Sequence, residues 1–148
     1  MTLFDKNHLI MNLDATNQDE VMGDLAQLAY DQGITTDKDQ LKKDLLDREK
    51  ESTTGFGNGV SIPHTKSDVV EEASVFFARG KNDVEWNSLD SKPVNTWVSL
   101  MIPTDQSDVH LKLLAQLSRQ LMHQDFIDIL KNGDEEQVYE AISNIVNV

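Results

Sequence analysis

Three glycines and a histidine that follows proline lie within twelve residues, GFGNGVSIPHTK, from Gly55 to Lys66. Glycine permits positive φ angles and close approach of the backbone, so Gly55 and Gly57 can turn amide groups towards a cavity without side chains in the way. Pro63 has a fixed φ angle and restricts the residue before it, which stiffens the chain that presents His64. The stretch predicts a rigidly held imidazole beside a glycine-walled cavity that could bind an anion.

Two common phosphate-binding motifs do not fit this stretch. A P-loop needs a lysine and a hydroxyl after its last glycine, whereas Gly59 is followed by Val60 and Ser61. A dinucleotide-binding turn needs the spacing G-x-G-x-x-G at the start of a helix, and here G-x-G-x-G leads into a predicted strand. Neither a P-loop nor a dinucleotide-binding fold is predicted.

Four further side chains could complete a site or lie apart from it. Arg48, in the run DREKE, belongs either to a solvated charge run or to the cavity, where its guanidinium could bind phosphate oxygens through two donors. His110 is expected in the first turn of a helix, on its apolar face, where burial and the helix dipole lower the pKa of the ring. The alternative for His110 is a core histidine bonded to a carbonyl. His8 and His123 are expected to be solvent-facing or locally bonded, without a special role.

The composition excludes several other kinds of chemistry. The chain has 148 residues, 39% of them hydrophobic, which suits one globular domain. It has no cysteine, so disulfides, thiolate zinc sites and cysteine nucleophiles are excluded. The formal charge of −13 repels nucleic acid and anionic lipid, although a local cationic pocket could still bind an anion. No apolar run approaches the ~18 residues of a membrane span and no signal-peptide pattern is present, so a cytoplasmic protein is expected.

Interleaved helical and strand patterns predict an α/β fold around these residues. A first helix is expected between a cap at residues 16–19 and Gly33, and a second from Asp37 towards Arg48 and Glu49, with Gly55 to Gly59 as a loop. The other predicted helices cover residues 107–124 and 135–146. The predicted strands cover residues 60–63, 74–78, 84–86 and 94–103, with a turn over residues 87–93.

The segment DREKESTTGFGNGVSIPHTK resembles the phosphorylation-site region of enzyme IIA domains of the fructose and mannitol class, in the bacterial phosphoenolpyruvate-dependent sugar phosphotransferase system. The arginine and glutamate, the two hydroxyls, the glycines and the proline–histidine ending all lie at the intervals of that family. VEWNSLDSKPV, VSLMIP and HLKLLAQLSRQL resemble its later motifs, so the resemblance spans nearly the whole chain. Thr54, Phe56 and Ser61 depart from it, since members more often carry a small residue or glycine, isoleucine and alanine at these positions.

The resemblance implies a phosphotransferase that works through a phosphohistidine. His64 is then the phosphoryl acceptor, His110 the second histidine beside it and Arg48 the active-site arginine. Candidates for the phosphate pocket are Ser52, Thr53, Gly55 and Gly57. The histidine-containing phosphocarrier protein is the implied donor and a cysteine of the IIB component the implied acceptor during sugar uptake. No metal, cofactor or direct contact with the sugar is expected, since in-line positioning and charge compensation are sufficient for such a transfer.

The resemblance also implies a single domain over residues 1–148, folded as a three-layer α/β/α sandwich with a central mixed sheet. Three other functions remain open. A regulatory relative would use the same phosphohistidine without sugar transport. A metal hydrolase would use His64, His110 and Glu49, although no ligand spacing supports it. A pure binding module would keep His64 as a structural residue only.

Overall fold

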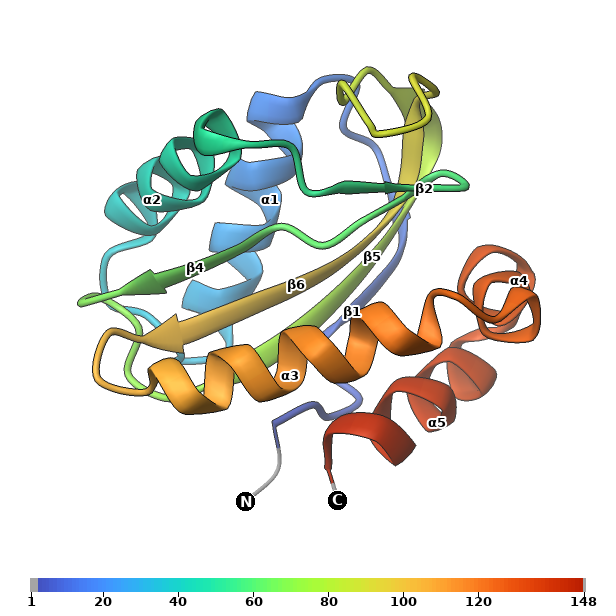
Figure 1. Ribbon diagram of the computed structural model, residues 1–148. Helices are drawn as coiled ribbons and strands as arrows, with labels where there is room; N and C mark the ends of the chain where they lie inside the picture. Colours follow the sequence, from blue (N-terminus) through green and yellow to red (C-terminus); the bar gives the residue numbers. More distant parts are fainter. Residues whose placement is uncertain (1–2, 148) are drawn as a thin grey trace.

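A six-stranded mixed sheet runs through the middle of the molecule (Figure 1). The computed structural model describes residues 3–147. The strand order is β1-β5-β6-β3-β2, with β4 also beside β6; β5–β6 and β2–β3 are antiparallel, and the other pairs are parallel. The elements, in chain order, are β1 (Leu9–Leu13), α1 (Gln18–Asp31), α2 (Lys38–Glu51), β2 (Gly55–Gly57), β3 (Val60–Ser61), β4 (His64–Ser67), β5 (Ser74–Val84), β6 (Val94–Pro103), α3 (Ser107–Gln120), α4 (Gln124–Asn132) and α5 (Glu135–Val146).

Helices cover both faces of the sheet. Alternate residues of the central strand β5 enter different cores: Val75 and Phe77 pack with α3, α4 and α5, whereas Phe76 and Ala78 pack with α1 and α2. A strand that is covered on both faces needs apolar residues at successive positions, which explains the continuous apolar run SVFFA. Figure 1 shows α1 and α2 on one side of the sheet and α3 and α5 on the other. The predicted three-layer α/β/α sandwich with a central mixed sheet is confirmed.

The ends of the first two helices follow the predicted capping residues. Asn17 Oδ1 accepts a hydrogen bond from the Glu20 N–H at 2.9 Å, and Asp37 Oδ1 accepts one from the Gln40 N–H at 3.1 Å. Gly33 has a φ angle of 75°, in the left-handed region where glycine follows the end of a helix, so α1 stops two residues before it. These local interactions determine where α1 and α2 begin and where α1 ends.

Two predicted boundaries at the C-terminal half were wrong. The helix expected over residues 107–124 ends at Gln120, and α4 begins separately at Gln124. The Arg79 guanidinium, on β5, donates to the Leu130 carbonyl through Nε at 3.0 Å and Nη2 at 2.6 Å, which holds the end of α4 against the sheet. The strand expected over residues 84–86 contributes only Val84, as the last residue of β5. None of the helices within residues 3–147 has both the length and the apolar character needed to cross a bilayer.

The glycine stretch is a hairpin, and the prediction of a loop there was wrong. Strands β2 and β3 pair through Gly55 and Gly57, and the two turn residues Asn58 and Gly59 have φ angles of 57° and 80°. The segment 85–93 between β5 and β6 packs on this hairpin. Its Leu89 N–H donates to the Gly55 carbonyl at 3.1 Å, and its Asp90 carboxylate accepts from the Asn58 N–H at 3.0 Å.

Gly55 allows the close contact between the hairpin and this segment. A Cβ atom at Gly55 would lie 2.8 Å from the Cα atom of Ser88, which is closer than real Cβ contacts. We expect Gly55→Ala to lower the free energy of unfolding by about 1–3 kcal/mol, because backbone must move to admit the methyl group. Gly23→Ala, in the middle of α1 with its nearest neighbour at 3.5 Å, is the control and should raise stability by about 0.5–1 kcal/mol. Urea denaturation measures both; equal effects would contradict the close packing.

Candidate functional site

His64 begins β4, at a point where the edge of the sheet is interrupted. β3 and β4 both pair in parallel with β6, but Pro63 between them has no N–H to donate. The Pro63 carbonyl still accepts from the Leu100 N–H at 3.0 Å, so the chain stays beside β6. His64 Nδ1 lies 2.7 Å from the Ile62 carbonyl oxygen. Because a carbonyl can only accept, Nδ1 carries the proton and Nε2 keeps its lone pair in the neutral ring.

His110 lies beside His64, in the first turn of α3. The two ring centroids are 5.0 Å apart, with an angle of 49° between the planes. His110 is 9% exposed, and its Nε2 atom is buried without a hydrogen-bond partner among residues 3–147. A buried polar atom without a partner is unfavourable, so this nitrogen is available for a group that enters the site.

Arg48 approaches His64 from the last turn of α2. Its Nη1 donates to the Ser52 carbonyl at 3.0 Å, which leaves other donors of the guanidinium available. Arg48 and His64 together line two adjacent hollows. The structure therefore brings His64, His110 and Arg48 together from β4, α3 and α2, as the sequence predicted.

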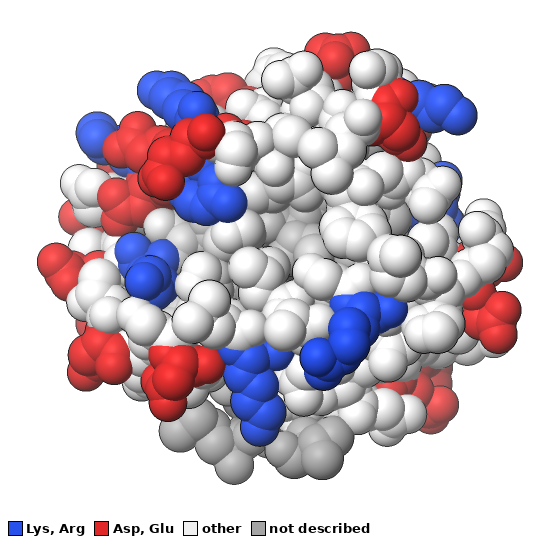
Figure 2. Space-filling view, in the orientation of Figure 1, with Lys and Arg blue, Asp and Glu red and all other residues white. Residues whose placement is uncertain are grey.

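The two hollows beside His64 differ in character. The larger, of about 510 Å³, also contains His110, Lys66 and several carboxylates of α2. The smaller, of about 150 Å³, is lined mainly by hydroxyl and apolar residues: Thr53, Thr54, Gly55, Phe56, Ile62, Leu89, Leu114 and Ser118. Figure 2 shows this face of the molecule, with an uncharged centre and acidic residues mostly towards its edges. Sequence reasoning missed Leu89, Leu114 and Ser118, because they come from segments distant in the chain.

Two of the four candidates for the phosphate pocket lie elsewhere. Thr53 and Gly55 line the smaller hollow, but Ser52 is exposed and lines neither hollow, since it ends α2 with its carbonyl towards Arg48. A Cβ atom on Gly57 would point to the Asp90 carboxylate, 3.6 Å from Oδ2, and not towards His64. Ser52, at the end of α2, and Gly57, beside Asp90, are therefore not among the residues that line the two hollows.

Burial and nearby cations keep both site imidazoles neutral. Burial lowers the pKa of His64, and Arg48 lowers it further, while the hydrogen bond to Ile62 partly offsets them. Burial is also the main cause that lowers the pKa of His110 to about 4, with further contributions from His64, Lys66 and Arg48. The direction for His110 agrees with the expectation from its place in the helix.

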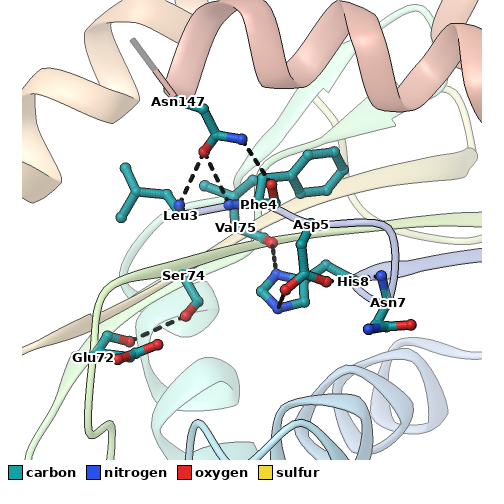
Figure 3. Close-up of polar contacts among 9 residues, drawn as sticks. All are labelled: Leu3, Phe4, Asp5, Asn7, His8, Glu72, Ser74, Val75 and Asn147. Carbon is teal, nitrogen blue, oxygen red and sulfur yellow. Dashed lines mark hydrogen bonds and ion pairs between the residues drawn. The ribbon is translucent and has the colours of Figure 1, made fainter. Parts of the chain in front are cut away.

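The other two histidines lie away from this site. His123 is exposed, as expected, and precedes α4. His8 is buried and not solvent-facing, but it has a local contact of the expected kind, since its Nε2 lies 3.5 Å from the Asp5 carboxylate. Its Nδ1 bonds to the Val75 carbonyl at 2.9 Å, and its ring stacks on Phe76 with centroids 4.4 Å apart. Figure 3 shows His8 beneath the N-terminal segment, which Asn147 holds by hydrogen bonds to Leu3 and Phe4.

Glu49 has a structural role in the loop that precedes the hairpin. Both of its carboxylate oxygens accept hydrogen bonds from Thr54. Within residues 3–147, no group of three or more histidine, aspartate and glutamate side chains is arranged to hold a metal ion. The hydrolase alternative would need Glu49 as a ligand, and its oxygens are already used.

The fold is that of known IIA proteins. The nitrogen regulatory protein IIA-Ntr from Neisseria meningitidis matches with a TM-score of 0.88 and 23% identity, over 95% of this chain and 96% of that one. Enzyme IIAMTL, in its complex with phosphorylated enzyme IIBMTL from Escherichia coli, matches with a TM-score of 0.79 and 16% identity, over 96% and 99%. These likenesses concern the fold.

The sequence comparisons give the family. A fructose-like EIIA component of a PTS system from Escherichia coli (strain K12) is 34% identical over 137 residues, which is 93% of each chain. The model of the family described as phosphoenolpyruvate-dependent sugar phosphotransferase system, EIIA 2, matches residues 2–145. The chain belongs to this family.

The lowered pKa of His110 predicts how the free energy of unfolding depends on pH. The unfolded ring has a pKa of about 6.5, so between pH 6.5 and about 4 the unfolded chain binds a proton there that the folded protein does not. The free energy of unfolding should therefore fall as the pH falls through this range. In His110→Gln that part of the fall is absent, whereas the parts due to His64 and the carboxylates remain. Urea denaturation at pH 7 and pH 5 measures the difference, and equal falls in both proteins would contradict it.

Proposed function

We propose that the chain, as an EIIA domain of type 2 over residues 1–148, is a phosphoryl carrier of a sugar phosphotransferase system. His64 accepts a phosphoryl group from the phosphohistidine of the histidine-containing phosphocarrier protein and passes it to a cysteine of a IIB component. The observation that carries this proposal is the bond from His64 Nδ1 to the Ile62 carbonyl, which leaves Nε2 free as a nucleophile beside His110 and Arg48. Membership of the EIIA 2 family supports it.

The proposed transfer needs no proton to leave His64. The Nε2 lone pair forms a bond to phosphorus while the bond from phosphorus to the donor nitrogen breaks, and that electron pair remains on the donor ring. The His64 ring gains positive charge as the new bond forms. Its Nδ1–H then donates a stronger, charge-assisted bond to the Ile62 carbonyl, 2.7 Å away. Transfer to the IIB thiolate reverses these steps, and His64 returns to the same neutral tautomer.

Arg48 and His110 are proposed to bind the phosphoryl oxygens. The Arg48 guanidinium offers two parallel donors to oxygens that carry negative charge during transfer. His110, with a pKa of about 4, is neutral at pH 7 and can donate one N–H from the buried Nε2 that otherwise has no partner among residues 3–147. A neutral donor beside Arg48 suits a carrier, because a second permanent cation would stabilise the phosphohistidine as much as the transition state and slow its departure.

The surface around His64 suits a protein partner. His64 itself is 5% exposed, so a partner must reach it through the hollows. Leu89 lines the smaller hollow and is 76% exposed, and Leu111, one residue after His110, is 66% exposed. Exposed apolar side chains beside a site favour burial against another protein. Enzyme IIAMTL, which has a similar fold, forms a complex with phosphorylated enzyme IIBMTL. This supports a IIB component as a partner here.

A regulatory phosphohistidine relay is the second candidate function. It is favoured by the fold match to a nitrogen regulatory protein with a TM-score of 0.88. Phosphorylation of His64 is common to both candidates, and only the next acceptor differs. Transfer from phosphorylated protein to a purified IIB component supports sugar transport, whereas a stable phosphoprotein in the presence of every IIB component of its organism supports regulation.

Incubation with phosphoenolpyruvate, enzyme I and the phosphocarrier protein tests the proposal directly. We expect one phosphoryl group, labile in acid and stable in base, on His64, located by mass spectrometry. His64→Ala should lose this label, whereas His123→Ala, which changes an exposed histidine, should keep it. A label that persists in His64→Ala would refute the assignment of the acceptor.

Arg48→Lys tests whether the guanidinium binds phosphate through two donors. Lysine keeps the charge but lacks the planar pair, so we expect normal folding and slower transfer in both directions. Loss of one charge-assisted bond of about 2–3 kcal/mol corresponds to a rate lower by roughly 30- to 150-fold. Arg119→Lys, on the exposed side of α3, is the control and should transfer at the wild-type rate. Wild-type rates in Arg48→Lys would instead place Arg48 in a solvated charge run.

A further inference from the structure

A buried series of hydrogen bonds lies behind the candidate site, between α2 and the hairpin. Glu49 is 8% exposed, and its Oε2 and Oε1 accept from the Thr54 N–H at 2.6 Å and the Thr54 hydroxyl at 2.5 Å. The Thr54 hydroxyl is also 2.9 Å from the hydroxyl of Ser61, which is fully buried. No ion pair within residues 3–147 includes Glu49, so the Thr54 donors stabilise its carboxylate.

The chemistry of these groups fixes the direction of each hydrogen bond. A carboxylate only accepts, so the single hydroxyl proton of Thr54 goes to Glu49. The Thr54 oxygen must then accept from Ser61, because Thr54 has no second proton to give. The series therefore runs from Ser61 to Thr54 to Glu49, and both hydroxyl donors are used. Removal of either hydroxyl leaves a buried polar group with one partner fewer.

Each end of this series is next to a residue that acts at His64. Glu49 directly follows Arg48 in the last turn of α2. Ser61 directly precedes Ile62, whose carbonyl holds His64 Nδ1. Thr54 joins the two ends a second time, because its own carbonyl accepts from the Ile62 N–H at 3.0 Å. Thr54 thus ties the Ser61 side chain and the Ser61–Ile62 peptide, which immediately precedes the Ile62 carbonyl, to the turn that carries Arg48.

We propose that Ser61, Thr54 and Glu49 form a positioning network that holds the Ile62 carbonyl, and with it the His64 ring, in register with Arg48 for phosphoryl transfer. The inference rests on the proposed carrier function of His64. The three residues do not bind the phosphoryl group. They act through Ile62, whose carbonyl selects the His64 tautomer with a free Nε2, and through the α2 turn, which places the guanidinium.

Thr54→Val and Thr54→Ser test the network as a matched pair, because valine removes the hydroxyl and serine keeps it. Ser61→Ala removes the other hydroxyl without adding atoms to the site. Ser99→Ala is the control, since Ser99 is also fully buried and its hydroxyl has no partner among residues 3–147. Thermal unfolding establishes that each variant is folded. The Ser61→Ala arm stands by itself if Thr54→Val does not fold.

Two readouts are needed for each variant. The first is the ¹⁵N chemical shifts of the His64 ring in the unphosphorylated protein, which report the tautomer and need no phosphoryl donor. We expect the Nδ1–H form in wild type, Thr54→Ser and Ser99→Ala, and a mixture of tautomers in Thr54→Val and Ser61→Ala. The second is transfer from the phosphocarrier protein, where we expect kcat to fall about tenfold with KM within twofold in the same two variants.

The outcomes separate this inference from the proposed function. Wild-type tautomer and kcat in both hydroxyl-free variants would overturn the network, as would a fall in kcat with an unchanged tautomer, since the proposed route passes through Ile62. An equal fall in Thr54→Ser and Thr54→Val would also overturn it, because the hydroxyl would then be irrelevant. If wild type accepts no phosphate, the carrier function fails, while a tautomer change in the variants still supports the hold on His64.

Discussion

The pairing of strand β6 with its neighbours is the constraint on which the site depends. β6 pairs with β5 on one side and with β3 and β4 on the other, so the segment that carries His64 is placed by hydrogen bonds to β6. His64 lies opposite Leu100 in this register. The chain leaves β6 at Pro103 and enters α3 at Ser107, so His110 returns over the same end of the sheet. One strand thus sets the separation of the two imidazoles, although they lie 46 positions apart in the sequence.

The charges around the two imidazoles are mixed, in a molecule that is acidic overall. The formal charge of the chain is −13, yet the groups that act on the two imidazoles are the cations Arg48 and Lys66. Burial and these cations favour the neutral rings and also attract a phosphoryl dianion. The carboxylates that line the larger hollow limit this attraction, which suits a group that must leave again. A carrier of the proposed kind needs a modest affinity for its phosphoryl group, and mixed charge around neutral histidines suits that need.

Local patterns predicted the parts of the fold that local interactions determine. The caps at Asn17 and Asp37 and the apolar strand β6 follow from neighbouring residues and were found as expected, whereas β5 begins at Ser74 as predicted but continues to Val84. The separate helix α4 was missed because its N-terminal residue, His123, makes no side-chain capping bond and its end is held by Arg79 on the sheet. The hairpin was missed because a glycine-rich stretch by itself predicts a loop. Here it forms paired strands on which another segment packs.

For the site too, the sequence predicted only those residues that carry a local signal. His64, His110 and Arg48 could be named because proline, helix position and the end of an apolar stripe each leave a local mark in the sequence. The resemblance to the IIA family added their roles. The positions of Ser52 and Gly57 outside the hollows could not be read from the sequence, because Ser52 follows the end of α2 and the register of β2 with β3 is irregular between Gly55 and Gly57. Leu89 could not be found, since it reaches the site only through the packing of segment 85–93 on the hairpin.

The hairpin of β2 and β3 has two effects on His64. Its buried side holds the backbone near His64 rigid, and its exposed side leaves the site open to a partner. On its inner side, Thr54 and Ser61 are buried and bonded to each other, so the backbone around Ile62 has little freedom. On its outer side, Gly55 leaves room for the segment that presents Leu89 at the rim of the smaller hollow. A proposed phosphoryl carrier must meet two different partners with one imidazole, so the ring must keep its orientation while the surface around it is covered and uncovered. The buried bonded groups keep the orientation of the ring, and the exposed apolar groups at the rim can be covered by a partner. Neither requirement needs a conformational change in the protein.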